Sequence, residues 1–160
     1  MNQWANFFAA IAGAAATLTG LIFVGVSISL NKILSIPKMP ARALGALTVL
    51  VNMLIVAVLC LVPGQAASSL GIELLCISVL AWLFILRLDL GLINKIEAQY
   101  KKYSFQNIVF SQVALLPFII GGVIILNTGF TGIYWLIPGI VFSFIKAVTA
   151  AWVLLIEIHR

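Results

Sequence analysis

The sequence predicts an all-α membrane protein with five transmembrane helices, the N-terminus outside and the C-terminus in the cytoplasm. Three observations carry this prediction: the composition, the lengths of the apolar segments and the distribution of positive charge. Of the 160 residues, 64% are hydrophobic and 8% are charged, whereas a soluble domain is about 45–50% apolar and about 25% charged. A domain of this size buries only about 70% of its unfolded surface. We therefore expect a lipid bilayer around the chain, which excludes soluble enzymes, nucleic-acid binders and secreted disulfide-linked domains.

The apolar segments have the length of transmembrane helices. A helix needs about 20 mainly apolar residues to cross about 30 Å of hydrocarbon. Five segments meet this requirement: residues 4–30, 41–62, 68–88, 105–126 and 133–158. Residues 63–67 and 127–131 are short, rich in turn formers, and predict two tight helical hairpins. Because residues 1–31 contain no Lys or Arg, we interpret the first segment as a retained helix and not as a signal peptide.

The positive charges predict the orientation. Lys146 lies inside the fifth segment, and the other basic residues all lie on one side of the predicted membrane: Lys32, Lys38, Arg42, Arg87, Lys95, Lys101, Lys102 and Arg160. An excess of Lys and Arg marks the cytoplasmic face, and only an odd number of crossings separates the charges in this way. Aromatic residues at the opposite boundary fit an interfacial belt: Trp4, Phe130, Tyr134 and Trp135.

Residues 88–103 carry apolar side chains at helical spacing, with charged side chains mostly on the other side. This pattern predicts an amphipathic segment on the inner headgroups or a third helix that continues past the membrane. Its simplest role is an ordinary anchor at the cytoplasmic face, although its basic residues could also attract anionic lipid.

The first segment has small residues at helical spacing, including Ala9, Gly13, Thr17 and Gly20. Small residues let a second helix approach closely, and close packing drives helix association in lipid. We expect this face to contact other helices of the same chain, with self-association between copies as the alternative.

The first half of the sequence resembles a group of small, functionally uncharacterised bacterial integral membrane proteins. The resemblance rests on short sequences at residues 7–8, 13–14, 20–24, 27, 40–43, 61–65 and 71–74, which read Phe-Phe, Gly-Ala, Gly-Leu-Ile-Phe-Val, Ser, Pro-Ala-Arg-Ala, Leu-Val-Pro-Gly-Gln and Gly-Ile-Glu-Leu. It implies a location in the bacterial inner membrane. It brings no known activity, substrate or site residues.

Lys146 is the most informative residue for function because a lysine at the centre of a spanning helix costs about 2.5–3.5 kcal/mol on insertion scales. It should therefore face protein or water, as part of a polar path, in a static ion pair, or with its ammonium reaching toward the interface. Glu73 is the acidic residue at the most similar predicted depth. We expect a Lys146–Glu73 ion pair, with a solvated Glu73 near the start of its helix as the alternative.

Other polar residues are candidates for the same path. Ser143 precedes Lys146 by three residues and shares its helical face; a Ser-x-x-Lys acyl-enzyme lacks its companion motifs here. Gln112 and Pro117 lie in the fourth segment, where a proline kinks a helix or, less commonly, interrupts it at a binding site. Asn52 is expected to hydrogen-bond across the second and third helices, near Ser78.

No cofactor, metal site or catalytic set is predicted. In the hairpin of the second and third predicted helices, Cys60 and Cys76 are about 7 Å apart along the helix axes. This separation is too large for a disulfide without backbone movement. With a single histidine in the chain, Cys and His cannot assemble a zinc site.

Three functions remain open. The first is a homo-oligomeric channel or small-solute conductor with a polar path around Lys146. The second is a non-transporting subunit or regulator that packs against another membrane protein. The third, an intramembrane enzyme, has no credible catalytic set, so we expect the protein not to be an enzyme.

Overall fold

The chain is all-helical over the residues that the computed structural model describes, namely 4–36, 39–93 and 101–159. In chain order the elements are α1 (Ala5–Ile28), α2 (Leu30–Ser35), α3 (Met39–Leu59), α4 (Ala67–Ile93), α5 (Lys101–Thr128), the 3-10 helix η3 (Gly129–Trp135) and α6 (Leu136–His159). The all-α part of the prediction is confirmed.

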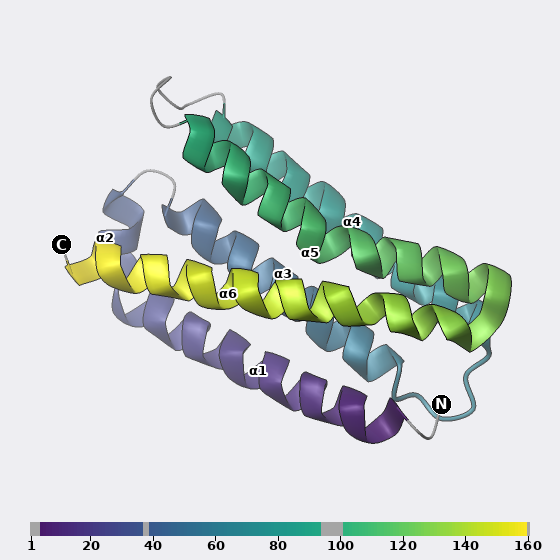
Figure 1. Cartoon of the computed structure of the whole chain (residues 1–160). Coiled ribbons are helices and arrows are strands. Elements are labelled where there is room, and N and C mark those ends of the chain that lie inside the picture. The colour runs from purple at the N-terminus through teal and green to yellow at the C-terminus, as the bar shows by residue number, and fades with distance from the viewer. Residues whose placement is uncertain (1–3, 37–38, 94–100, 160) are drawn as a thin grey trace.

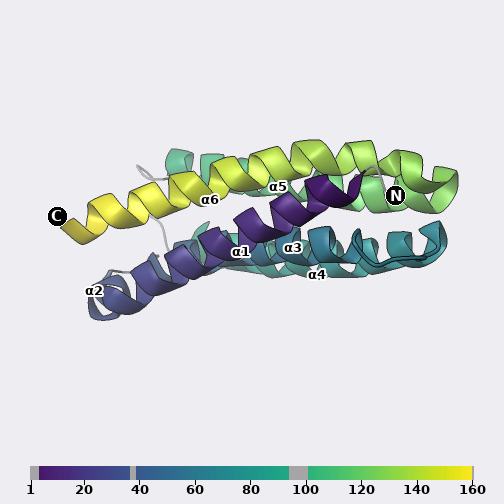
Figure 2. The same cartoon turned by 90° about the horizontal axis from the view of Figure 1, so that it is seen from below.

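Helices α3, α4, α5 and α6 form a closed four-helix ring. Each of them packs against the next in the chain, and α6 returns to pack against α3. Helix α1 packs against α3 and crosses the other helices obliquely (Figures 1 and 2). The ring interior is filled by large buried side chains, among them Leu50, Met53, Leu74, Leu115 and Phe118.

The chain has the helices of a membrane protein. Four segments are long and apolar enough to cross a bilayer: Ala5–Ile28, Met39–Leu59, Ala67–Gly91 and Ile108–Val153. The last of these has 46 residues and contains most of α5, all of η3 and most of α6. The start of α1 and the end of α6 lie at opposite ends of the bundle (Figure 1).

The two predicted turns connect α3 to α4 and α5 to α6. Gly64 has a φ of 70° and Gly129 a φ of 75°, a left-handed conformation that glycine adopts without steric cost. Gly129 thereby ends α5, and the chain continues as a seven-residue 3-10 helix. The predicted start of the last helix at residue 133 is therefore wrong, since α6 begins at Leu136.

Other helix boundaries also differ from the prediction, including those of the second helix, predicted at 41–62 and found as α3 at Met39–Leu59. The first helix ends at Ile28 and, after Ser29, resumes as the short α2. Helix α4 continues to Ile93, five residues past the predicted end, which agrees with a third helix that extends beyond its apolar run. Within the predicted segment 88–103, residues 94–100 lie outside the described part of the chain. Helix α5 extends from Lys101 to Thr128, beyond the predicted 105–126.

The small-residue face of α1 does not pack inside the chain. Its buried residues are Phe8, Ala15 and Ile22, which recur every seven residues and so share one face. Ala9, Gly13, Thr17 and Gly20 are exposed, and a Cβ at Gly13 or Gly20 would meet no atom within 4 Å. The expected use of this face within the chain is wrong, because the larger side chains fill the contact with the bundle.

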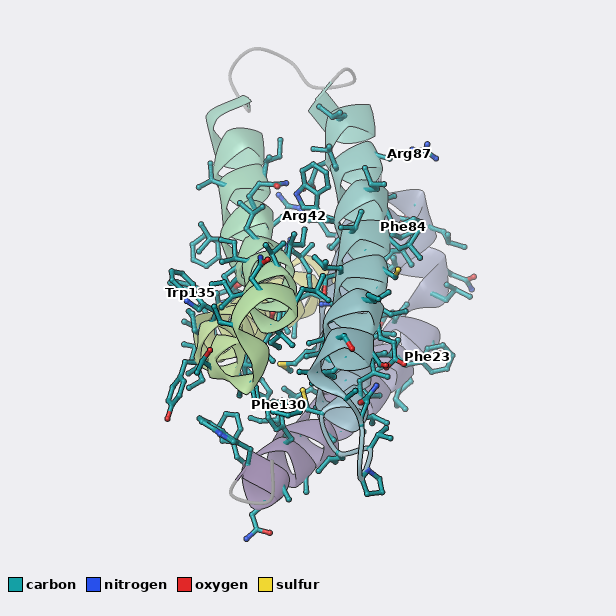
Figure 3. The ribbon with its side chains drawn as sticks, turned by 90° about the vertical axis from the view of Figure 1, so that its right-hand side faces the viewer. Phe23, Arg42, Phe84, Arg87, Phe130 and Trp135 are labelled. Atoms are coloured by element: carbon teal, nitrogen blue, oxygen red, sulfur yellow. The ribbon has the colours of Figure 1, made fainter. Side chains whose placement is uncertain are left out.

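Aromatic rings join the start of α1 to η3. The rings of Trp4 and Tyr134 are 5.1 Å apart and pack edge to face, and Trp4 also packs on Phe7 at 5.7 Å. In Figure 3, Phe130 lies toward this end of the bundle, whereas Arg87 lies toward the end of α4 and points outward. Trp4, Tyr134 and Phe130 thus lie at the end of the bundle opposite to Arg87.

Glycines bring α4, α5 and α6 close together. A Cβ at Gly132 would lie 2.6 Å from the backbone nitrogen of Ile125, and one at Gly121 would lie 2.7 Å from Cδ2 of Leu136. On the other side of α5, a Cβ at Gly122 would lie 2.9 Å from Cγ of Leu75. The paired glycines Gly121 and Gly122 therefore permit close packing on two sides of α5.

We predict that Gly132→Ala destabilises the protein by about 1–3 kcal/mol, the usual cost of overpacking, because the added methyl meets backbone that cannot rotate away. The free energy of unfolding in mixed detergent micelles, followed by circular dichroism, measures this loss. Gly45→Ala is the control, since a Cβ there has open space and alanine favours helix by about 1 kcal/mol. Equal stability of the two variants would contradict the packing argument.

Candidate functional site

The buried polar side chains of the described residues gather on the four ring helices. They are Asn52 on α3, Ser78 and Asp89 on α4, Ser111 on α5, and Ser143 and Lys146 on α6. Helix α1 contributes none of them. Since burying a polar group away from water is costly unless it finds a partner, their position in one ring indicates a common polar interior.

Lys146 is the centre of this interior. Its side chain is 6% exposed, and its Nζ donates a hydrogen bond to Oγ of Ser111 on α5. The bond joins α6 to α5 far from the turn between them. The structure thus confirms that the lysine faces protein and shows that its partner is Ser111, which the sequence analysis did not pair with it.

The close contacts at glycines show which residues lie at the same level. A Cβ at Gly139 would lie 3.0 Å from the ring of Phe118; seven residues further along each antiparallel helix, Lys146 is level with Ser111. A Cβ at Gly122 would touch Leu75, so the same counting along α4 brings residue 86 to that level. Asp89 lies three residues beyond, or about 4.5 Å along the axis.

Asp89 is the acidic residue that acts on Lys146. It is 6% exposed, and its carboxylate interacts electrostatically with the lysine ammonium. The sequence analysis counted Asp89 among the charged side chains of residues 88–103, opposite their apolar side chains; this placement is wrong, because Asp89 is buried. A usable signal was present, since Ser78, Ala81, Ile85 and Asp89 follow one another at spacings of three, four and four residues, the pattern of one buried helical face.

The predicted ion pair between Lys146 and Glu73 does not form. An oxygen of Glu73 accepts a hydrogen bond of 2.5 Å from Nε2 of Gln65 in the turn between α3 and α4. Glu73 lies thirteen residues from the level of Lys146 on α4, about 20 Å. The prediction counted depth from the start of each helix, but Leu136 packs at Gly121, so α6 begins about two turns deeper than α4.

Ser143 lies one turn before Lys146, as predicted, and is fully buried. Its hydroxyl has no hydrogen-bond partner among the described residues. Gln112 follows Ser111 and accepts a hydrogen bond from Nε1 of Trp82 on α4. The Nε2 of Gln112 is buried and also without a partner in the described part of the chain.

Asn52 and Ser78 are buried in the ring, but the hydrogen bond expected across their hairpin is not formed. Neither polar atom of the Asn52 side chain, nor Oγ of Ser78, has a partner within the described ranges. A hydrogen bond needs heavy atoms within about 3.2 Å, and the two side chains do not meet this condition.

Pro117 does not interrupt its helix. Helix α5 runs through it from Lys101 to Thr128, so an unwound binding segment of the transporter type is not formed there. The two cysteines, Cys60 and Cys76, are both free.

A scan against protein-family models, a search of curated proteins and a search of solved structures each returned no match.

We predict energetic coupling between Lys146 and Ser111. Ser111→Ala should lower the free energy of unfolding by about 1–3 kcal/mol, because the buried ammonium loses its acceptor. In a Lys146→Met background the same change should cost much less, since no charge is left to satisfy. A double-mutant cycle of unfolding free energies measures the coupling, expected at about 0.5–3 kcal/mol.

The control for this cycle is Ser69→Ala, which removes an exposed hydroxyl on α4 and should show no coupling to Lys146→Met. A Lys146–Ser111 coupling no larger than that of Ser69 would contradict the hydrogen bond.

Proposed function

We propose that the protein is a multi-pass protein of the bacterial cytoplasmic membrane that conducts a small solute along a polar path around Lys146. The observation that carries this proposal is the burial of Lys146 in a ring whose four helices all contribute polar side chains. A charged residue inside a membrane is expensive and is a candidate functional residue by default.

The membrane arrangement that we propose has five crossings. The 46-residue segment Ile108–Val153 is twice as long as one crossing requires, and it contains two helices that pack against each other. This supports two crossings by α5 and α6. In this arrangement Lys32, Arg42 and Arg87 all lie toward the same face. An excess of Lys and Arg marks the cytoplasmic face, which puts the N-terminus outside and the C-terminus inside.

The path runs within one protomer. Lys146, Ser111 and Ser143 are buried in the ring of a single chain, so a second copy is not required to line it. The copies of the proposed homo-oligomer contact each other through α1, whose exposed small residues Gly13 and Gly20 allow close helix approach. Each protomer would then carry its own path.

A non-transporting membrane subunit is the second candidate. The observation that favours it is the same exposed small-residue face of α1, which a helix of another membrane protein could cover. In this function the Lys146–Ser111 hydrogen bond would hold α5 to α6, and no solute would cross.

The topology is tested by labelling single cysteines with a membrane-impermeant maleimide, in a chain whose own cysteines are replaced by alanine. We predict that Thr131→Cys is labelled from outside the cell, and that Lys32→Cys and a cysteine tag at the C-terminus are labelled only in inverted vesicles. Labelling of Thr131→Cys and the C-terminal tag from the same side would contradict five crossings.

Conduction is tested with the purified chain in liposomes, by measuring chloride, potassium and proton fluxes. We predict that at least one flux exceeds that of protein-free liposomes and falls in Lys146→Met, because the path loses its central polar group. Lys32→Met is the matched control, since Lys32 is exposed. Folded protein that conducts none of the three would refute the conductor and favour the subunit.

A further inference from the structure

The buried polar groups form a succession along the ring, from the end where α4 finishes toward the end where it begins. Counted on α5, Asp89 is level with residue 108, Lys146 with 111 and Ser143 with 114. Ser78 is level with residue 119, and the half-buried Glu73 follows at the level of 124. These levels follow from the contacts of Gly139 with Phe118 and of Gly122 with Leu75. Neighbouring groups are thus separated by about 4.5–7.5 Å along the axis.

Several buried polar atoms lack hydrogen-bond partners in the described part of the chain. They are both polar atoms of Asn52, the hydroxyls of Ser78 and Ser143, Nε2 of Gln112 and Oε1 of Gln65. Buried polar groups in proteins are almost always hydrogen-bonded, to protein or to water. Asp89, Lys146 and Ser143 follow one another at about 4.5 Å along the axis, a separation that one bridging water molecule spans, so these three groups have the chemistry of a hydrogen-bonded chain.

The interior is too well filled for a hydrated ion. Leu115 and Phe118 on α5, Leu74 on α4 and Ile140 on α6 are at most 3% exposed and occupy levels between Ser143 and Glu73. A proton needs no such width, because it moves by exchange along hydrogen bonds.

The charges near Lys146 are those of an acid–base pair. On α4, Asp89 acts on the lysine, whereas Arg87 points outward (Figure 3). Residues 108–128 of α5 contain no ionisable side chain. Among residues 39–59 of α3 the one ionisable side chain is that of Arg42. It is half buried and lies toward the end of the bundle where Asp89 lies. A lysine and an aspartate can each hold or release a proton, whereas arginine stays protonated.

We propose that the conducted species is the proton, and that Lys146 and Asp89 are the two groups that pass it on. This inference rests on the proposed conductor function and names its substrate. An N–H bond of the Lys146 ammonium breaks and an O–H bond forms on the Asp89 carboxylate, through a bridging water molecule, which leaves a neutral amine and a neutral acid. Asp89 then releases its proton toward the end where α4 finishes. Lys146 regains one from the Ser143 side, and one proton has moved with no change in oxidation state.

The test uses the full chain in liposomes that contain a pH-sensitive dye, with a potassium diffusion potential set by valinomycin. We expect proton uptake above that of protein-free liposomes. Lys146→Arg should abolish it, because the arginine keeps the positive charge of the site but does not release a proton. Asp89→Asn should abolish it as well. Arg87→Met, an exposed change on α4, should leave it intact.

Each outcome decides between the inference and the function on which it rests. Proton uptake that survives Lys146→Arg in folded protein would overturn the relay. Chloride or potassium flux that depends on Lys146, without proton uptake, would overturn the inference and leave the conductor function standing. Absence of every flux from folded protein would overturn both. Circular dichroism and gel filtration of each variant in detergent establish that it is folded.

Discussion

Polar groups inside a bilayer must find their partners within the protein, and this constraint determines which way each helix faces. Hydroxyl groups on the outer surfaces satisfy their hydrogen-bonding capacity within their own helix. Thr17, Ser27 and Thr48 each donate a hydrogen bond to the backbone carbonyl one turn earlier. An ammonium has no such local solution, because it carries a charge as well as protons. Lys146 therefore has to point into the ring, and α6 cannot rotate without exposing it to lipid.

Close packing of the helices then determines which side chains contact Lys146. Glycines at 121, 122, 132 and 139 let α5 approach its neighbours to distances at which an added Cβ would clash or nearly clash. These contacts hold α5 and α6 in one register. Ser111, eighteen residues before η3 begins, and Lys146, eleven residues after η3 ends, therefore reach the same level. The hydrogen bond at the site thus depends on residues that carry no polar group at all.

The sequence was sufficient for the helices and their turns but not for the pairing of side chains across helices. Apolar runs of 20 or more residues and the glycines at 64 and 129 locate the elements, since length and turn chemistry are local properties. The axial position of one helix relative to another is not a local property of the sequence, because it depends on contacts between residues far apart in the chain. Counting from helix ends paired Lys146 with Glu73, whereas η3 shifts α6 along its neighbours and brings Ser111 and Asp89 to the lysine instead. Asp89 escaped notice because charged neighbours in the sequence made its segment resemble a surface helix.

Helix α1, through which copies of the chain could contact each other, lies apart from the polar interior of the ring. It lies outside the ring and packs on α3 through Phe8, Ala15 and Ile22, while every buried polar side chain of the described residues belongs to the ring. A contact between copies through the exposed small residues of α1 would therefore leave the surroundings of Lys146 unchanged. If the polar path had run between copies, its polar residues would have to lie on exposed helix faces, and Lys146, Ser111 and Ser143 do not. The burial of these three side chains thus argues that the proposed path, if present in the membrane, is completed within each chain and not between copies.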